Sequence, residues 1–425
     1  MKRTLTLALA LSLSAASAQD VTRVRFVSLA WQTDAVAAVK SIVNEWNAKN
    51  PKIQVQYQQV DWGSIQDYLT TSFESKNTPD LVHYESGPVM EFGRRGFLTD
   101  LGPSIPAEMK QDVAAGAWKT VTDANGKVYG VPFLWESLIT LYNKDAFKAA
   151  GIKAPTVAKP WTWDDLQRAA KQLTKDTNGD GKPEQYGAAF GLRSGANRIL
   201  NLSLGFGGDY FAKQNGRDVI QVGANEKKLL GILMDMLYTS KTASPDGVGL
   251  SGPELLPGFY AGKYAMLPGI GVWARQQIVE SGPKGLNWGV LPPLKATSQA
   301  QGSTTQTLSI PTAAKNPQAA AKFMQFFLNR VNMGRLAAGD WLFPTRVSTL
   351  GGVPFQTDAY GWKTSTASAK VLTMAAWQKV DGFSEVKSKV LTPYLQQLFA
   401  NRISVDQFAK GVEQDGNAIL RKYDR

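Results

Sequence analysis

The sequence contains no cysteine and only one histidine, His83. Without disulfides, the folded chain must be stabilised by an ordinary hydrophobic core. The sequence has too few Cys and His residues for a zinc site or for a catalytic triad that depends on His. Downstream of the N-terminus, no stretch reaches the about 18 consecutive apolar residues of a membrane-spanning helix. These absences argue against a zinc protein, a His-dependent hydrolase and a membrane-embedded chain, and we expect no cofactor.

Clusters of basic charge are also missing, although Lys and Arg outnumber Asp and Glu by 47 to 35 and the formal net charge is +12. The basic residues are dispersed, and the tightest groups are pairs such as Arg94 and Arg95. There is no basic run and no nucleic-acid-binding motif. We therefore expect a solvated basic surface and no nucleic-acid partner.

Residues 1–18 have the pattern of a signal peptide. The basic residues Lys2 and Arg3 precede an apolar run over 4–13, which is too short to span a bilayer. Ala16 and Ala18 fit a cleavage site, and no Cys follows that could carry a lipid. We expect a soluble protein that is exported to the periplasm or another extracytoplasmic space. The about 407 residues that remain exceed one core and predict about two domains.

The first third of the mature chain alternates strands and helices. Apolar periodicity predicts strands at 23–30, 53–58 and 80–84, and helices at 35–47 and 63–76. This order is typical of a largely parallel, doubly wound α/β sheet. Ligands of such sheets bind beyond the C-terminal ends of the strands. Trp31 and the Tyr84–Glu85 pair lie at such ends.

The stretch from 129 to 152 has the pattern of a hinge. An apolar crossing at 130–133 is followed by Trp135 and Glu136, and then by an apolar run that leads into a helix start at Asn143. A segment of this kind would leave one lobe, offer ligand contacts and enter the core of a second lobe.

Several short stretches together resemble the extracellular solute-binding proteins of ABC importers, in the group that carries sugars and oligosaccharides. They are TPDLV at 78–82 with GFL at 96–98, YGVP at 129–132, LYNKDAF at 141–147, WTWDDL at 161–166, GKYAM at 262–266 and KNPQAA at 315–320. Each stretch is weak by itself, but their order and spacing across the mature chain are specific.

The resemblance implies a periplasmic-binding-protein-like α/β fold. Two α/β lobes with doubly wound, mixed sheets would be joined by about three hinge crossings near 131–133, 301–305 and 343–346. We expect the first lobe to comprise 19–131 and 302–344, and the second to comprise 132–301 and 345–425 with the C-terminal helices. The lobes would close around a ligand in the cleft between them.

The same resemblance implies a function without catalysis. A monomeric receptor would capture a sugar or oligosaccharide in the cleft and deliver it to permease subunits in the membrane. Aromatic faces match the C–H faces of sugar rings, and carboxylates, amides and Arg bind adjacent hydroxyls. The candidate ligand-binding residues are Trp31, Gln32, Tyr84, Glu85, Trp135, Glu136, Trp273, Ser303, Trp341 and Arg346.

Alternative roles remain open for some of these residues. Trp135 could pack at the lobe interface and Arg346 could form an inter-lobe salt bridge. Trp62 could line the rim of the cleft, but it is expected to pack. The segment 82–87 also resembles the strand tip of receptors for sn-glycerol-3-phosphate or glycerol phosphodiesters, in which case Arg346 would bind the phosphate. A secreted carbohydrate-active enzyme would need a pair of carboxylates, such as Glu85 and Glu136.

The loop at 176–184 resembles the first nine positions of a calcium-binding EF-hand loop. Its ligands would include Asp176, Asn178 and Asp180, but Gly187 stands where the bidentate Glu should be. A hydrogen-bonded Asx turn is therefore the favoured interpretation, and calcium is a weak alternative.

Overall fold

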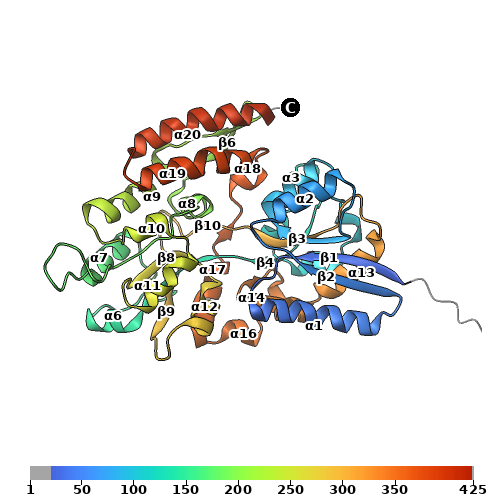
Figure 1. The fold of residues 1–425 in the computed structure, drawn as a ribbon, viewed down its shortest axis with the longest axis horizontal. Helices are drawn as coiled ribbons and strands as arrows, with labels where there is room; N and C mark the ends of the chain where they lie inside the picture. Colours follow the sequence, from blue (N-terminus) through green and yellow to red (C-terminus); the bar gives the residue numbers. More distant parts are fainter. Residues whose placement is uncertain (1–20, 424–425) are drawn as a thin grey trace, which may run out of the picture.

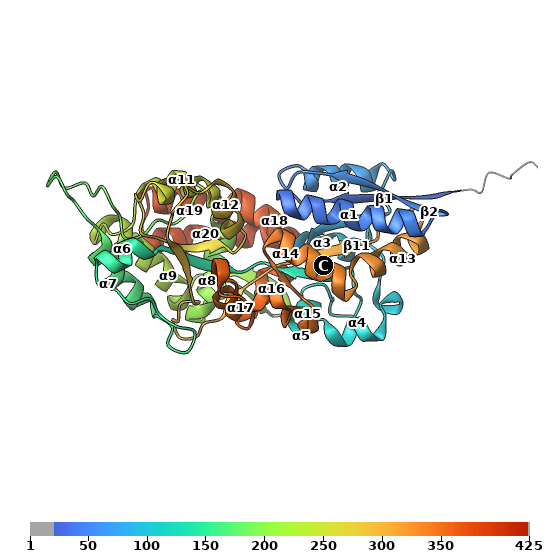
Figure 2. The ribbon, with the colours of Figure 1, turned by 90° about the horizontal axis from the view of Figure 1, so that it is seen from below.

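The structure, a computed structural model, describes residues 21–423, so the expected signal peptide lies outside the described residues. Figure 1 shows two α/β bodies side by side, one with α1–α3 and the other with α6–α9 and the C-terminal helices α19 and α20. Figure 2 shows the same two lobes from below, with α14, α16 and α17 at their junction in both views. Within the described residues, no helix is both long and apolar enough to cross a membrane.

The first lobe contains a six-stranded mixed sheet with the strand order β12-β4-β11-β3-β1-β2. The strands β1, β2 and β3 pair in parallel, and β11 runs antiparallel to both β3 and β4. This arrangement confirms the predicted alternation of strands and helices. The strands are β1 (Thr22–Ser28), β2 (Ile53–Gln59), β3 (Leu81–Glu85), β4 (Val131–Trp135), β11 (Thr305–Ser309) and β12 (Phe343–Pro344).

Helices cover this sheet because their apolar faces match its buried side chains. Helix α1 buries a stripe that includes Val39, Val43 and Trp46. Phe26 of β1 contacts two rings of α13, with centroids 5.6 Å from Phe323 and 5.2 Å from Phe327. The helices are α1 (Thr33–Lys49), α2 (Ile65–Glu74), α3 (Ser86–Arg94), α4 (Ala107–Asp112), α5 (Ala115–Lys119), α13 (Pro317–Phe327) and α14 (Arg330–Asp340).

The second lobe is built on a three-stranded antiparallel sheet with the order β8-β5-β9. Its strands are β5 (Leu138–Asn143), β8 (Met266–Gly271) and β9 (Trp288–Leu291), and a separate hairpin pairs β6 (Phe211–Gln214) with β7 (Arg217–Ile220). The Asn143 side chain accepts hydrogen bonds from two backbone amides and begins the helix that follows β5.

The helices of the second lobe surround these strands and come from two parts of the chain. The first group is α6 (Lys144–Ala149), α7 (Trp163–Leu173), α8 (Ala196–Ser203), α9 (Ala224–Met234), α10 (Asp246–Gly249), α11 (Leu256–Tyr260) and α12 (Ala274–Ser281). The second group is α17 (Trp362–Ala369), α18 (Phe383–Val386), α19 (Thr392–Phe399) and α20 (Val405–Leu420). It is preceded by α15 (Val347–Leu350), which packs against α14 and β12 of the first lobe, and by α16 (Val353–Gln356).

The first crossing lies later in the chain than the sequence indicated. Residues 131–133 are not a crossing, because the whole of β4 pairs with β11 and β12 inside the first sheet. The chain leaves that sheet only after Trp135, so Glu136 and Ser137 form the connection to β5. The expected boundary between residues 131 and 132 is therefore displaced by about one strand.

The two later connections join elements of different sheets. The short strand β10 (Gln301–Gly302) pairs with β13 (Leu372–Thr373), whereas β11, which follows after two intervening residues, belongs to the first sheet. After β12, the chain passes through α15 and α16 before α17 packs against β5 and β9. The remaining lobe boundaries stay predictions.

Arg346 anchors the start of the last connection to the first lobe. Its side chain is buried, and its guanidinium donates hydrogen bonds of 3.0–3.1 Å to Glu108 and Asp112 of α4. These two carboxylates raise the pKa of Arg346 against the opposing effect of burial. The arrangement is an ion cluster within the first lobe, rather than an inter-lobe salt bridge.

Replacing Arg346 by Met should destabilise the protein by about 1–3 kcal/mol, because Asp112 would lose its cation while the apolar stem is kept. The urea midpoint of tryptophan fluorescence measures the effect. Lys363→Met is the matched control, because Lys363 and its partner Asp358 are both exposed and 4.0 Å apart. An unchanged midpoint for Arg346→Met would contradict this role.

Candidate ligand-binding cleft

Three cavities open between the two lobes, and Glu85 lines all of them. The first, here called the tryptophan cavity, has a volume of about 290 Å³. It is lined by Trp31, Trp62, Glu85, Glu136, Trp273, Thr304, Gln306, Asp340 and Leu342. Because the three cavities share lining residues, they form one elongated cleft.

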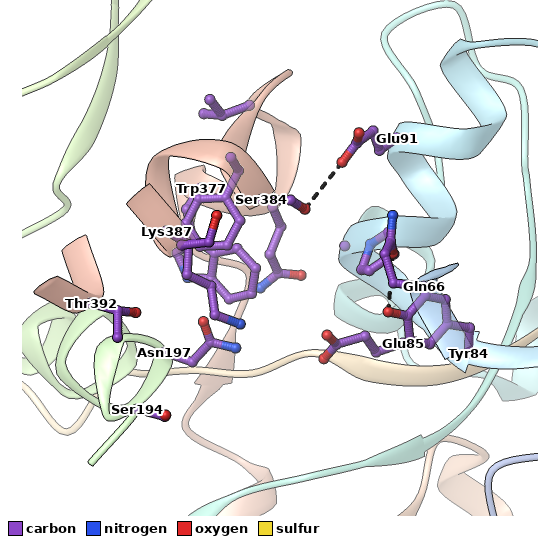
Figure 3. A pocket seen from close by; sticks show the side chains of 16 residues that line it. Gln66, Tyr84, Glu85, Glu91, Ser194, Asn197, Trp377, Ser384, Lys387 and Thr392 are labelled. Carbon is purple, nitrogen blue, oxygen red and sulfur yellow. Dashed lines mark hydrogen bonds between the residues drawn. The ribbon is translucent and has the colours of Figure 1, made fainter. Parts of the chain in front are cut away.

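The other two cavities extend the cleft along the second lobe. The arginine cavity, of about 260 Å³, includes Arg193, Arg198, Asn197 and Ser303 as well as Glu85 and Glu136. The lysine cavity, of about 390 Å³, is shown in Figure 3, where Tyr84 and Glu85 of the first lobe face Trp377 and Lys387 of the second. A ligand that fills the cleft would therefore contact both lobes.

Strand ends carry the first-lobe side chains into the cleft. Trp31 follows β1, Trp62 follows β2 and Glu85 ends β3, so three neighbouring parallel strands deliver them to one edge of the sheet. This edge is where the topology of an open α/β sheet places its ligand. Tyr84 is more deeply buried and donates its hydroxyl hydrogen to Gln66 Oε1 at 3.1 Å.

The second lobe contributes Trp273, which lies between β8 and α12. Its ring packs directly over Gly271, where a Cβ atom would lie 2.0 Å from Trp273 Nε1. A glycine is therefore required at this position for the indole to face the cleft. The Trp273 ring meets Trp31 of the first lobe edge to face, with centroids 5.9 Å apart.

Glu136, on the first crossing, is a buried carboxylate with a strongly raised pKa. Burial raises its pKa to about 7, and the charges of Glu85 and Asp340 add to the shift. The hydrogen bond from Trp273 Nε1 to Glu136 Oε1, at 3.0 Å, and the charge of Arg198 act in the opposite direction. Burial also raises the pKa of Glu85, against the effects of Lys387 and Thr304.

A chain of neutral groups holds Asp340 at the cavity. Gln306 Oε1 can only accept, so His83 must donate from Nε2 at 2.7 Å and is the neutral Nε2–H tautomer. The amide nitrogen of Gln306 then donates to Asp340 Oδ2 at 3.0 Å. Burial lowers the pKa of His83 to about 4, in keeping with a neutral ring, and raises the pKa of Asp340 to about 6.

The structure brings six of the ten candidate residues to the cleft and places four elsewhere. The six are Trp31, Tyr84, Glu85, Glu136, Trp273 and Ser303. Gln32 is buried behind the tryptophan cavity, where its amide donates to the backbone oxygen of Asp340 at 2.8 Å. It therefore supports the site rather than lining it.

Trp135, Trp341 and Arg346 line none of the three cavities. Trp135 is buried in β4 against the first lobe. Trp341 stacks on Trp362, with centroids 5.4 Å apart, and lies beside the guanidinium of Arg275. Their indoles pack in cores, and Arg346 is held in the ion cluster described above, so the structure places these three residues outside the cleft.

Sequence reasoning missed the polar residues that face the cleft from helices. Asp340 ends α14 and precedes Trp341, the residue that was chosen as a candidate in its place. Asn197 and Arg198 lie in the first turn of α8. Trp62 was expected to pack, yet it is 37% exposed and lines the tryptophan cavity. Its position after a strand, between Asp61 and Gly63, is the signal that could have identified it.

The loop at 176–184 groups the carboxylates of Asp176, Asp180 and Glu184 within 4.8 Å of one another. Asp176, Asn178 and Asp180 all accept hydrogen bonds from backbone amides of the loop itself. These bonds are those of the Asx turn that the sequence favoured, and exposed acidic groups alone do not define a calcium site.

Comparison with known proteins identifies the class. Residues 30–334 match the family described as bacterial extracellular solute-binding protein. The chain belongs to this family, which confirms the resemblance seen in its sequence motifs.

Individual relatives agree with this assignment. An uncharacterised lipoprotein of Streptomyces antibioticus is 38% identical over 388 residues, which cover 91% of this chain and 84% of the relative. A maltooligosaccharide ABC transporter solute-binding lipoprotein of Streptococcus pneumoniae is 30% identical over 270 residues, or 62% of this chain and 58% of the relative. The solved structure of the sugar-binding protein MalE from Xanthomonas citri superposes with a TM-score of 0.80 at 20% identity, covering 95% of this chain and 98% of that one. The fold is therefore that of two-lobed solute receptors.

Glu136→Gln should stabilise the unliganded protein at alkaline pH. A carboxyl whose pKa is raised from 4.5 to about 7 on folding binds more protons in the folded state across this window. Its ionisation therefore weakens the fold as pH rises from about 5 to 8. We expect the variant to gain on the order of 1 kcal/mol near pH 8 and little near pH 5.

Thermal unfolding of both proteins across this range measures the difference. Asp406→Asn is a suitable control, because Asp406 is exposed and its partner is the surface residue Lys227. Parallel pH profiles for wild type and Glu136→Gln would contradict a raised pKa of Glu136 in the folded protein.

Proposed function

We propose that this protein is an exported receptor that captures an oligosaccharide in the inter-lobe cleft and delivers it to the permease subunits of an ABC importer. The observation that carries the proposal is the tryptophan cavity, where Trp31, Trp62 and Trp273 accompany Glu85 and Glu136. Indole faces suit the apolar faces of sugar rings, and carboxylates accept hydrogen bonds from hydroxyl groups.

The length of the cleft supports an oligosaccharide over a single sugar. The tryptophan cavity continues into the arginine and lysine cavities through Glu85, and the last two also share Ser194 and Asn197. Each cavity contains at least one tryptophan or a pair of polar side chains, so each offers contacts for a further ring. Relatives include proteins described as binding maltooligosaccharide, arabinooligosaccharide and diacetylchitobiose.

The lobes touch on both sides of the cleft in this conformation. On one side Gln277 of the second lobe donates to Gln32 Oε1 of the first at 3.3 Å, next to the Trp31–Trp273 contact. On the other side Arg94 forms a salt bridge of 2.6 Å with Asp381. Entry of a ligand requires these contacts to open and re-form, so binding and lobe closure are one process without bond cleavage.

The cleft gives little support to a phosphate ligand held by Arg346. That guanidinium is buried and is already paired with two carboxylates. The carboxylates of the tryptophan cavity would also repel an anion. We therefore favour a sugar ligand over a glycerol phosphodiester.

Oligosaccharide binding should change tryptophan fluorescence and raise the melting temperature. A panel of maltotriose, arabinotriose, cellotriose and diacetylchitobiose tests this, and a ligand at 100 times its dissociation constant adds about 2.7 kcal/mol of stability. Trp62→Ala should weaken binding by about tenfold or more through loss of ring stacking.

Trp118→Ala is the matched control, because Trp118 lies on the first lobe outside the cleft and donates to Lys110 O. Binding that is lost equally in both variants would argue against the tryptophan cavity. A complete lack of response to every sugar would refute the proposed function.

A further inference from the structure

The tryptophan cavity carries an excess of negative charge. Glu85, Glu136 and Asp340 line it, and no Lys or Arg is among its lining residues in the described part of the chain. Three carboxylates in one partly dehydrated space repel one another unless a positive charge joins them. The cavity therefore has the electrostatics of a cation-binding site.

The nearest basic side chains face these carboxylates from the adjoining cavities. Arg198 influences Glu136, but it lines the arginine cavity and its Nε donates to Gly269 O. Lys387 influences Glu85 from the lysine cavity. Neither side chain occupies the tryptophan cavity itself.

Asp340 is the carboxylate of this cavity whose negative charge has no nearby positive partner within residues 21–423. Asp340 is only 4% exposed, yet the side chains that donate to it among the described residues are neutral amides: Gln306 donates to its carboxylate and Gln32 to its backbone oxygen. Burial raises its pKa to about 6, as expected for a carboxylate without a cation. A buried carboxylate that faces a cavity and has only neutral partners points to a ligand that supplies the positive charge.

The walls of the cavity suit the same ligand. Trp31, Trp62 and Trp273 surround the carboxylates, and Trp rings attract cations through their electron-rich faces. A neutral sugar accounts for the stacking surfaces, but its hydroxyl groups bring no positive charge into the tryptophan cavity. A protonated amine satisfies both the rings and the carboxylates.

We propose that the ligand presents a protonated amino group to the tryptophan cavity, so that the sugar captured by this receptor is an amino sugar or an oligosaccharide with a free amine. This inference rests on the proposed function and specifies its substrate class. The ammonium would lie between Glu136 and Asp340, with its ring against a tryptophan face.

Matched sugar pairs test the inference by isothermal titration of the full mature chain. Each pair differs only in amines that replace hydroxyls: one amine separates glucosamine from glucose and galactosamine from galactose, and two separate chitobiose from cellobiose. N,N′-diacetylchitobiose extends the last pair, because its two nitrogens are amides and carry no charge. We expect an amine to bind about tenfold or more tightly than its neutral partners, the ratio for one well-placed ion pair.

Variants separate charge recognition from general damage to the cleft. Asp340→Asn keeps an acceptor for Gln306 and should remove most of the preference for the amine, while the affinity for the neutral sugar stays the same or rises. Glu136→Gln should act in the same direction and serves if Asp340→Asn does not fold. Asp406→Asn removes an exposed charge outside the cleft and should preserve the preference.

The outcomes distinguish this inference from the proposed function. If neutral or acetylated sugars bind as tightly as the amines, or only these bind, the receptor function stands and the amino-sugar inference falls. If no member of any pair and no longer oligosaccharide binds, both fall. An amine preference that survives Asp340→Asn and Glu136→Gln would also overturn the assignment of the ammonium site.

Discussion

The repulsion between three carboxylates in the tryptophan cavity is the constraint on which the rest of the cleft depends. Glu85, Glu136 and Asp340 come from the end of β3, the first crossing and the end of α14. Neutral donors hold two of them in place: Trp273 donates to Glu136, and Gln306 donates to Asp340. These donors fix the geometry of the two carboxylates without placing a positive charge in the tryptophan cavity, and this leaves room for a ligand that carries one.

The same residues connect the cleft to the hinge. Glu136 lies on the first crossing, and its backbone oxygen accepts a hydrogen bond from Ser303 on the second crossing. A change in lobe angle therefore moves a carboxylate that lines the cleft together with both connections. A ligand that favours the closed position of Glu136 shifts the lobe equilibrium by its differential affinity for the two states. In the proposed function, these contacts within the crossings would couple binding to closure.

The sequence predicts the parts of the fold and site that depend on local pattern. Trp31 and Glu85 could be identified because a doubly wound sheet places strand ends at its ligand edge. The first crossing was misplaced because β4 is a strand only through pairing with β11 and β12, about 170 or more residues later, and local periodicity does not report such pairing. Asp340 and Lys387 carry no local signal, because packing of helices from distant segments brings them to the cleft.

The charge of the cleft is independent of the charge of the whole chain. The formal net charge is +12, yet the tryptophan cavity is acidic, because the basic residues are dispersed and the carboxylates are concentrated. Closure removes water and strengthens every electrostatic interaction inside. Without a cation, closure therefore raises the cost of bringing three carboxylates together, and with a cation it increases the attraction. The opposite signs of these two effects make lobe closure itself selective for a positively charged ligand.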